Sequence, residues 1–190
     1  PARDRTLAIR SPSLGVWLMG PSLSRCPPPC QAVPDRVSRG MTFRSYMETA
    51  LAEARAAATR GEVPVGAVVV RDGEVLARAG NRTRELNDPT AHAEVLAIRA
   101  ACAVLGQERL PGCDLYVTLE PCPMCAAAIS FARIGRLYYG AADPKSGGVA
   151  HGARVFEHPQ CHHAPEVYDG IGGEAAERLL KDFFADRRDG

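Results

Sequence analysis

Along residues 41–190, short apolar runs with strand-like composition alternate with stretches in which apolar side chains recur at helical spacing. The Val-rich run at residues 65–70 is followed by an Asp-Gly pair, which is typical of a hairpin turn, and then by a second apolar run. We expect these two runs to pair as antiparallel strands. In all, strands are predicted at residues 65–70, 75–79, 115–119 and 136–140.

Four helices fit between and around these strands. Their apolar stripes predict helices at residues 46–60, 91–105, 121–133 and 174–188. Residues 143–173 are rich in Gly, Pro and His and follow no regular period, although residues 154–156 are a candidate for a short strand. Alternation of strands and helices predicts an α/β protein, a three-layer α/β/α sandwich with helices on both faces of one sheet.

The length and composition fit one domain with its own core, because 46% of the 190 residues are hydrophobic and 24% are charged. The longest apolar runs are far shorter than the roughly 20 residues of a membrane-spanning helix, so we expect a soluble protein with no membrane partner. A net charge of +1 argues against a protein that coats nucleic acid with a basic surface. Any RNA or DNA partner would be held locally, by a few placed groups.

Residues 1–40 differ in composition from the rest of the chain. They hold seven of the 15 prolines, and six Arg against two Asp. Such a segment predicts no packed structure. Its Arg and Ser content has some likeness to an organelle transit peptide, but we interpret it as a disordered or non-native N-terminal extension, with the working domain at residues 41–190.

The chain has seven cysteines, an odd number with no spacing that suggests a disulfide framework. This set fits a reduced, cytoplasmic protein better than a secreted one. In that compartment a closely spaced pair indicates a metal or redox site. The cysteines are Cys26, Cys30, Cys102, Cys113, Cys122, Cys125 and Cys161.

Three potential zinc ligands lie at the starts of two predicted helices. Cys122 and Cys125 are three residues apart, so a helix holds them within about 60° of each other and both sulfurs can reach one ion. His92 stands at the start of the preceding helix, two residues before Glu94. Because two residues turn by about 200°, His92 and Glu94 face one site only if the first turn points at it. Helix N-termini also favour the thiolate form that binds metal.

The number of ligands separates a structural zinc site from a catalytic one. A structural site is closed by four protein ligands, whereas a catalytic site leaves a position for water. His92, Cys122 and Cys125 are three, with no fourth Cys or His close by in sequence. Glu94 is then the carboxylate that moves protons. The alternatives are a buried histidine beside two inert core cysteines, or a thioredoxin-like cysteine pair, which would leave His92 and Glu94 without a role.

His-x-Glu combined with Pro-Cys-x-x-Cys is the signature of zinc-dependent base deaminases. Beyond these motifs, residues 41–190 resemble the bacterial tRNA-specific adenosine deaminases, and residues 1–40 lie outside the resemblance. The segments that carry it are EVPVGA (62–67), GNR (80–82), DPTAHAE (88–94), LYVTLEPC (115–122) and FFADRR (183–188). The resemblance implies a sandwich of the cytidine deaminase type, with a central mixed sheet of about five strands.

The resemblance also implies a reaction: hydrolytic conversion of adenosine to inosine at wobble position 34 of an arginine tRNA, by a homodimer with one zinc ion per subunit. It assigns the zinc to His92, Cys122 and Cys125 and the proton transfers to Glu94. It assigns base binding to Asn81. Contacts with the anticodon stem-loop would come from Asp143, Lys145, Phe184 and Arg187.

Several of these residues have plainer interpretations. Asn81 could serve only a turn, Phe184 could be a core residue, and Arg187 could be the solvated end of a helix. Residues 158–163 contain three His and one Cys, which we interpret as a surface loop, because a second metal site would have no carboxylate partner in view.

Two other functions fit the same motifs. A deaminase of a free base or nucleoside, guanine above all, needs the same machinery but no tail such as residues 183–188. A zinc-stabilised binding module without activity needs a fourth ligand, for which Cys113 and Cys161 are candidates. An RNA loop suits the deaminase chemistry, because a base there leaves its stack at less cost than in a duplex.

Overall fold

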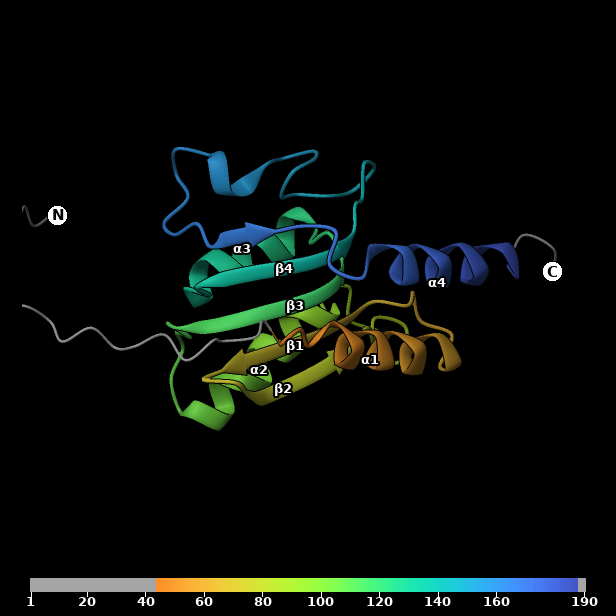
Figure 1. The fold of residues 1–190 in the computed structure, drawn as a ribbon, viewed down its shortest axis with the longest axis horizontal. Coiled ribbons are helices and arrows are strands. Elements are labelled where there is room, and N and C mark those ends of the chain that lie inside the picture. Colours follow the sequence, from red (N-terminus) through yellow and green to blue (C-terminus); the bar gives the residue numbers. More distant parts are fainter. Residues whose placement is uncertain (1–43, 188–190) are drawn as a thin grey trace, which may run out of the picture. The chain divides into compact units, whose positions relative to one another are not determined.

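The structure is a computed structural model that describes residues 44–187. Within these residues, five strands form one mixed sheet in the order β2-β1-β3-β4-β5 (Figure 1). The strands are β1 (Gly66–Arg71), β2 (Glu74–Gly80), β3 (Cys113–Leu119), β4 (Arg136–Ala141) and β5 (Glu166–Tyr168). The predicted fold class is therefore confirmed.

The strand directions place the C-terminal ends of β3 and β4 at the same end of the sheet. β1 pairs antiparallel with both β2 and β3, whereas β3 with β4 and β4 with β5 are parallel. The β1–β2 hairpin turns at Asp72 and Gly73, which have positive φ angles of 52° and 81°. Because β3 and β4 are parallel, the segments that follow them leave the sheet side by side.

Helices cover both faces of the sheet (Figure 1). α1 and α4 pack against one face, and α2 and α3 against the other, where they also contact each other. A side chain at Gly66 would collide with the Ala50 carbonyl oxygen, so this glycine lets α1 pack directly against β1. The helices are α1 (Met47–Thr59), α2 (Ala93–Leu105), α3 (Pro123–Ala132) and α4 (Gly173–Ala185).

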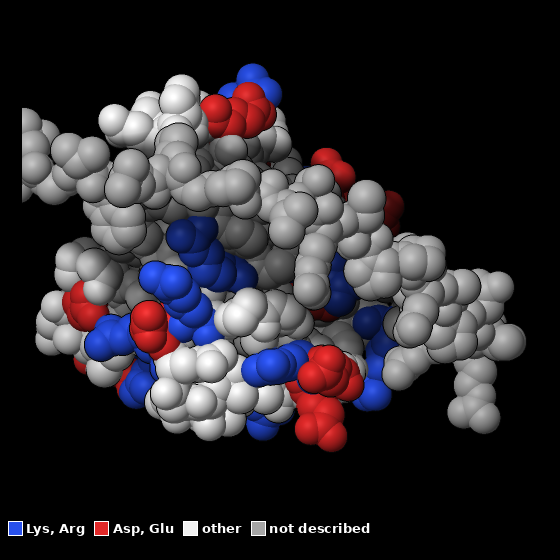
Figure 2. All heavy atoms as spheres, turned by 90° about the vertical axis from the view of Figure 1, so that its left-hand side faces the viewer, with Lys and Arg blue, Asp and Glu red and all other residues white. Residues whose placement is uncertain are grey.

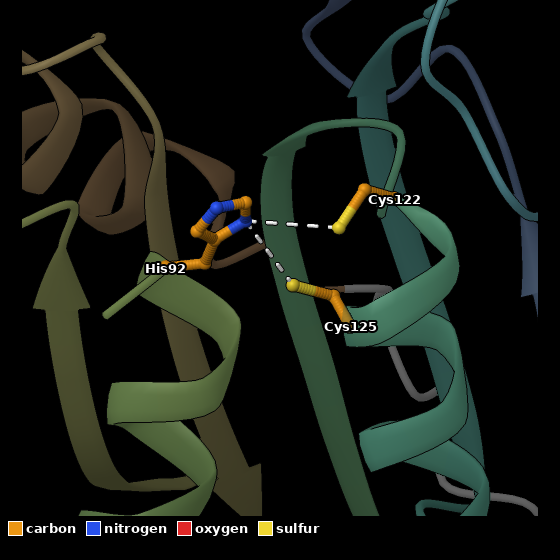
Figure 3. Close-up of side chains that lie close together, drawn as sticks. All are labelled: His92, Cys122 and Cys125. Atoms are coloured by element: carbon orange, nitrogen blue, oxygen red, sulfur yellow. Dashed lines mark hydrogen bonds between the residues drawn. The ribbon is translucent and has the colours of Figure 1, made fainter. Parts of the chain in front are cut away.

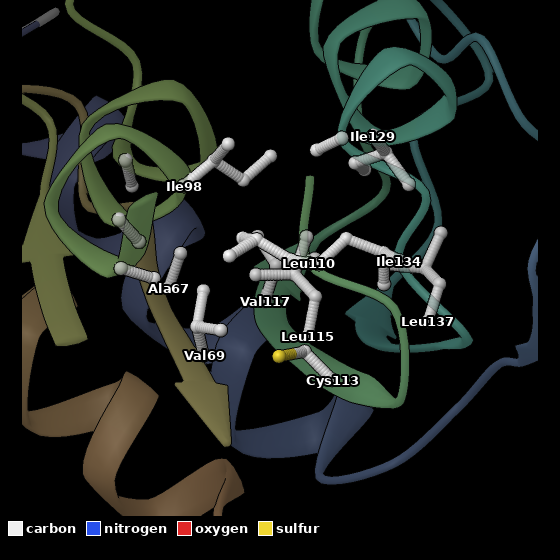
Figure 4. Packing of buried hydrophobic residues seen from close by; sticks show 14 of the residues in the cluster. Ala67, Val69, Ile98, Leu110, Cys113, Leu115, Val117, Ile129, Ile134 and Leu137 are labelled. Carbon is white, nitrogen blue, oxygen red and sulfur yellow. The ribbon is translucent and has the colours of Figure 1, made fainter. Parts of the chain in front are cut away.

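The larger core lies between the sheet and the pair α2 and α3 (Figure 4). Leu115 and Val117 of β3 point into it and are fully buried, while Tyr116 between them points to the α1–α4 side. Ile129 of α3 packs into the same cluster. Each such side chain stabilises the fold by about 1.5–3 kcal/mol. This packing fixes α2 and α3 relative to β3, and therefore fixes where both helices begin.

The predicted strand at residues 154–156 is wrong. Arg154 has a positive φ of 42°, and the next residues form a short 3-10 helix, η1 (Val155–Glu157), in which the N–H of Glu157 donates to the Arg154 carbonyl oxygen. The fifth strand is β5, where the N–H of Glu166 donates to the Gly135 carbonyl oxygen and continues the parallel pairing.

The predictions for residues 1–40 lie outside the described residues. Across residues 44–187, no helix has both the length and the apolar character needed to cross a membrane.

Candidate active site

Two helices begin at the site with their first side chains turned outward. His92 is the N-cap residue of α2 and Cys122 is the N-cap residue of α3, and both have extended backbone, with ψ of 151° and 169°. Neither side chain caps its own helix. Pro123 follows Cys122 and disfavours helical backbone in it. Both side chains are therefore free to face a common point.

Asn81, which follows β2, takes over the cap of α2. Its Oδ1 accepts the N–H of Ala93 at 2.8 Å, and its Nδ2 donates to the Val63 carbonyl oxygen at 3.2 Å. This side chain from another element satisfies an N–H that the His92 side chain leaves unpaired. The position of Asn81 thus fixes the first turn of the helix that carries His92 and Glu94.

His92, Cys122 and Cys125 converge (Figure 3). His92 Nδ1 lies 3.7 Å from Cys122 Sγ and 3.5 Å from Cys125 Sγ. A tetrahedral zinc ion with ordinary bond lengths separates nitrogen and sulfur ligands by about 3.6 Å. The triad therefore has the spacing of a zinc site. Within residues 44–187 it is the one group of three or more His, Cys, Asp or Glu residues close enough to share an ion.

Hydrogen bonds among the three donors shift their pKa values in different directions. Hydrogen bonds from Cys125 and, next in size, from His92 lower the pKa of the Cys122 thiol to about 4. The same Cys122 contact, together with burial, raises the pKa of Cys125 and thus keeps it protonated. The hydrogen bond with Cys122 also raises the pKa of His92. Of these shifts, the lowered pKa of Cys122 favours the thiolate form that binds a metal ion.

Glu94 is the second residue of α2 and is only 3% exposed. Among the buried side-chain nitrogen and oxygen atoms of residues 44–187, its Oε2 is the one that lacks a hydrogen-bond partner. Burial raises the pKa of Glu94 to about 7. Such a carboxyl can both accept and donate a proton near neutral pH, which is what general acid–base catalysis requires.

A cavity of about 200 Å³ opens onto Glu94 and onto two residues of the triad, His92 and Cys122. Of the residues expected at the site, Asn81, His92, Glu94, Cys122 and Asp143 line it, while Cys125 is buried. The full lining is Val63, Val65, Asn81, Thr83, His92, Glu94, Leu119, Glu120, Cys122, Asp143 and Ser146. The cavity therefore has an apolar side and a polar, acidic side.

The other expected RNA contacts do not line this cavity. Lys145 is exposed, and its N–H donates to Asp143 Oδ1 at 3.1 Å, so Asp143 also shapes the turn that carries it. Phe184 is 48% exposed on α4. Arg187 donates to the Gly61 carbonyl oxygen at 2.8 Å and stacks over the Phe183 ring at 4.0 Å. These three residues thus stand outside the cavity.

The structure adds two buried carboxylates that the sequence patterns do not single out. Glu62 accepts the N–H groups of Arg84 and Glu85, each at 2.9 Å, and the Thr83 hydroxyl at 3.1 Å. Burial by itself would raise the pKa of Glu62, but these hydrogen bonds outweigh it and lower the pKa. Glu62 thereby holds the segment after β2, which brings Thr83 to the cavity.

Glu120 plays the same part for the segment after β4. Its Oε1 accepts N–H groups from residues 149–151, and its Oε2 accepts the N–H of Asp143. As for Glu62, hydrogen bonds outweigh burial and lower its pKa. The one sequence signal for this carboxylate is a Glu at the end of an apolar strand, directly before the Pro-Cys motif.

The remaining Cys and His candidates have other surroundings. Cys113 is buried in the core, and Cys161 contacts Ser130 Oγ at 3.4 Å, so neither joins the triad as a fourth ligand. In the loop at residues 158–163, His158 Nδ1 accepts the N–H of Gln160 and His163 Nε2 contacts the Ile134 carbonyl oxygen. Within this loop, no three His or Cys residues lie close enough to share a metal ion.

Many charged side chains elsewhere on the surface form ion pairs with one another. Figure 2 shows the end of the molecule where β1 ends and β3 and β4 begin, with acidic side chains beside basic ones. Arg136 Nε lies 2.7 Å from Asp114 Oδ1 there. A larger cavity of about 460 Å³, between α1, β2 and α2, is lined by ion-paired residues such as Arg82 and Glu85. It contains none of the triad, so the chemistry points to the smaller cavity.

A triad of one imidazole and two sulfurs beside a buried carboxyl, at the helix N-termini of an α/β/α sandwich, is the arrangement typical of zinc-dependent base deaminases. The family model for the cytidine and deoxycytidylate deaminase zinc-binding region matches residues 41–141. The tRNA-specific adenosine deaminase of Agrobacterium fabrum is 66% identical over 143 residues, which cover 75% of this chain and 94% of that protein. The one from Rickettsia bellii is 45% identical over 145 residues, or 75% of this chain and all of that protein.

Solved structures agree with these relatives. A structure from biochemical and structural studies of A-to-I editing by tRNA:A34 deaminases is 67% identical, with a TM-score of 0.70, over 71% of this chain and 98% of that one. The guanine deaminase from Nitrosomonas europaea is 25% identical, with a TM-score of 0.64, over 73% of this chain and 82% of that one. The chain therefore belongs to the cytidine and deoxycytidylate deaminase family and, within it, to the tRNA-specific adenosine deaminases.

Proposed function

We propose that this protein converts adenosine to inosine at wobble position 34 of tRNA(Arg), by hydrolytic deamination in the cytoplasm. The observation that carries the proposal is the buried Glu94 carboxyl, whose Oε2 is unpartnered at a cavity that also contains His92 and Cys122. The 66% identity to a tRNA-specific adenosine deaminase supports the choice of substrate.

The donor set fits one zinc ion per subunit, held by His92, Cys122 and Cys125. Three ligands with near-tetrahedral spacing leave one position open. When bound at such a site, zinc lowers the pKa of a coordinated water from 15.7 to about 7. The thiolate of Cys122 and the neighbouring imidazole supply the negative charge and the lone pairs for this ion.

Glu94 moves the protons of the reaction. Its carboxylate takes a proton from the attacking water and gives it to the ring nitrogen next to C6 of adenine, which makes C6 a better electrophile. The hydroxyl oxygen bonds to C6, and Glu94 then takes the remaining proton of that hydroxyl and gives it to the amino group. The C–N bond breaks, ammonia leaves, and C6 keeps the oxygen as a carbonyl. Burial places the pKa of Glu94 at about 7, so neither its protonated nor its ionised form is costly at neutral pH.

The cavity holds the base. Val63, Val65 and Leu119 offer an apolar surface to a flat purine ring. Asn81 Nδ2 donates one hydrogen to the Val63 carbonyl oxygen, and its second hydrogen is available to a ring nitrogen of the base. Asn81 thus both positions α2 and orients the substrate.

The anticodon stem-loop is the proposed partner. Asp143 and Lys145 stand on the loop that borders the cavity, Phe184 is on α4, and Arg187 follows the end of that helix. An exposed aromatic ring and an exposed guanidinium near one helix end suit an unpaired base and a phosphate. The self-paired surface charges favour such local contacts over a broad basic face.

A homodimer is also part of the proposal. Phe131 on α3 is 66% exposed, next to the small residues Ala127 and Ala128 on the same helix. A large exposed ring on a helix of small residues suits close packing against a second copy. Sedimentation velocity at several protein concentrations tests this, and a monomer at all of them contradicts it.

Incubation with an anticodon stem-loop of tRNA(Arg), with and without a chelator, tests the function. We expect inosine at position 34, loss of activity with the chelator, and recovery when zinc is added back. Guanine, adenosine and cytidine are tested in parallel, because the guanine deaminase of Nitrosomonas europaea shares the fold. Ammonia release from a free base or nucleoside, with no inosine in RNA, would overturn the proposal.

A further inference from the structure

Glu120 is the residue directly after β3, two positions before Cys122, and it is 2% exposed. The hydrogen bonds to its carboxylate come from one segment, residues 143–151. Oε1 accepts the N–H groups of Val149, Ala150 and His151 at 3.2, 2.9 and 2.9 Å. Oε2 accepts the N–H of Asp143 at 3.1 Å and contacts His151 Nδ1 at 2.7 Å.

This carboxylate closes the segment into a loop that has little regular structure of its own. The N–H groups of residues 149–151 make no bond to a neighbouring strand. The carboxylate accepts them instead, as the carbonyl oxygens of a paired strand would in a sheet. Four backbone N–H groups around one charge form a nest that favours an anion.

The loop fits closely around Glu120. A side chain added at Gly147 would place its Cβ 2.5 Å from the Asp143 carbonyl oxygen and 2.5 Å from Glu120 Oε1. The N–H of Gly148 donates to the Pro121 carbonyl oxygen at 2.8 Å, which ties the loop to the start of α3. The loop therefore has one position relative to the helix that carries Cys122 and Cys125.

Two residues of the same loop, Asp143 and Ser146, line the substrate cavity. The N–H of Asp143 donates to Glu120 Oε2, and this bond positions Asp143. Asp143 Oδ1 in turn accepts the N–H of Ser146 at 3.0 Å, which positions Ser146. A chain of two hydrogen bonds thus joins the buried carboxylate to the cavity wall.

Resting on the proposed function, we propose that Glu120 is a positioning residue that fixes the cavity wall of residues 143–146 and thereby sets how selectively the enzyme accepts the nucleotides beside the target base. Glu120 itself takes no part in proton transfer, because both of its oxygens are occupied by donors of the loop.

Glu120→Gln is the sharpest test, because the change keeps the shape of the side chain. An amide oxygen can still accept the N–H groups of residues 149–151, and a His151 tautomer can accept from the amide nitrogen. The N–H of Asp143 has no such option and would face an NH₂ group. The substitution therefore releases Asp143, which lines the cavity and positions Ser146.

We expect Glu120→Gln to keep the zinc content of the wild type. Amide hydrogen exchange should speed up at Asp143 and stay unchanged at Arg84 and Glu85, which Glu62 holds. KM for the anticodon stem-loop should rise by about 5- to 100-fold, the range of one lost buried hydrogen bond, with kcat within about threefold of the wild type. The preference for the natural neighbours of the target base, measured on stem-loops with either neighbour changed, should shrink.

Gly147→Ala is a second way to displace the cavity wall of residues 143–146. The added methyl group would push the loop away from the Glu120 side chain, which itself is not substituted. This variant should reproduce the higher KM and the weaker preference. Asp114→Asn is the matched control: it makes the same carboxylate-to-amide change at the opposite end of β3, in the pair with Arg136. It should leave KM and the preference unchanged.

Unchanged exchange at Asp143, or an unchanged KM and preference in Glu120→Gln, would overturn the inference. A loss of zinc in that variant would do so too, because Glu120 would then support the metal site instead of the wall. A wild-type protein that deaminates no RNA would refute the proposed function. It would not decide the role of Glu120 in holding the loop, which the exchange pattern tests without substrate.

Discussion

Replacing Glu94 by Gln separates the chemistry of the site from its architecture. The substitution exchanges one carboxyl oxygen for an amide nitrogen of nearly the same size, in a side chain that is 3% exposed. Because Glu94 Oε2 makes no hydrogen bond, its replacement by an amide nitrogen breaks none. The three sulfur and nitrogen donors are untouched.

The expected effects differ greatly in size. Removing a general acid–base lowers turnover by about 10²- to 10⁴-fold, which raises the activation barrier by about 2.7–5.4 kcal/mol. The free energy of unfolding should change by less than about 1 kcal/mol, because neither an existing hydrogen bond nor packing is lost. Zinc content should match that of the wild type.

The assay follows single-turnover inosine formation on the anticodon stem-loop, with zinc measured in the same samples and unfolding followed in urea. Chemistry is isolated under single-turnover conditions, so product release cannot mask the loss. A Glu94→Gln protein with near-normal turnover would refute the role of Glu94 in proton transfer. Loss of zinc along with activity would show that this carboxyl supports the metal site instead.

Three further predictions concern stability and RNA binding. The hydrogen bonds that lower the pKa of Glu62 stabilise the fold above its ordinary pKa of 4.5, and this contribution is lost as pH falls toward the lowered value. In urea unfolding between pH 3 and 7, the free energy of unfolding of Glu62→Gln should therefore fall less steeply with acid than that of the wild type. An equal dependence on pH would contradict this. Ile129→Ala should cost about 2–5 kcal/mol in urea unfolding, because Ile129 is fully buried between α3 and the sheet, and a loss under 1 kcal/mol would argue against this packing. Arg187→Ala should raise KM for the stem-loop and leave turnover of any free nucleoside unchanged. Its exposed contact with Gly61 should cost at most about 1 kcal/mol of stability when lost. Equal effects on both substrates would show that Arg187 does not contact the RNA.

The layers of the fold could be predicted from sequence because their signals are local. The Asp-Gly turn determines the first hairpin, and the Val-rich run gives β1. The short β5 could not be found in this way, because its three residues are all exposed and have no apolar alternation. Its pairing depends on β4, which lies about 30 residues earlier in the chain. The segment at residues 155–157 has an apolar sequence, but the backbone of Arg154 turns it into η1.

The candidate site likewise contains residues that the sequence predicts and contacts that it does not. His92, Glu94, Cys122 and Cys125 could be grouped from spacing, because zinc ligands and their carboxylate need particular residue types at particular intervals. The capping of α2 by Asn81 could not be anticipated, because the bond joins Asn81 to a helix start 12 residues away. Phe184 and Arg187 stand apart from the cavity, so only an RNA complex or a substitution can test their proposed contacts.

The two buried carboxylates explain why the cavity walls need little secondary structure. Glu62 holds the segment after β2 and Glu120 holds the segment after β4, and these two strands lie on opposite sides of the β1–β3 pair in the sheet. Because a carboxylate can accept several N–H groups at once, N–H groups of each loop are satisfied by one buried side chain rather than by a neighbouring strand. Each loop is thereby held in place beside the triad, which is fixed on α2 and α3. Hydrophobic periodicity in a sequence predicts which face of a helix or strand is buried. It gives no signal for a single acidic residue that is buried because it holds a loop.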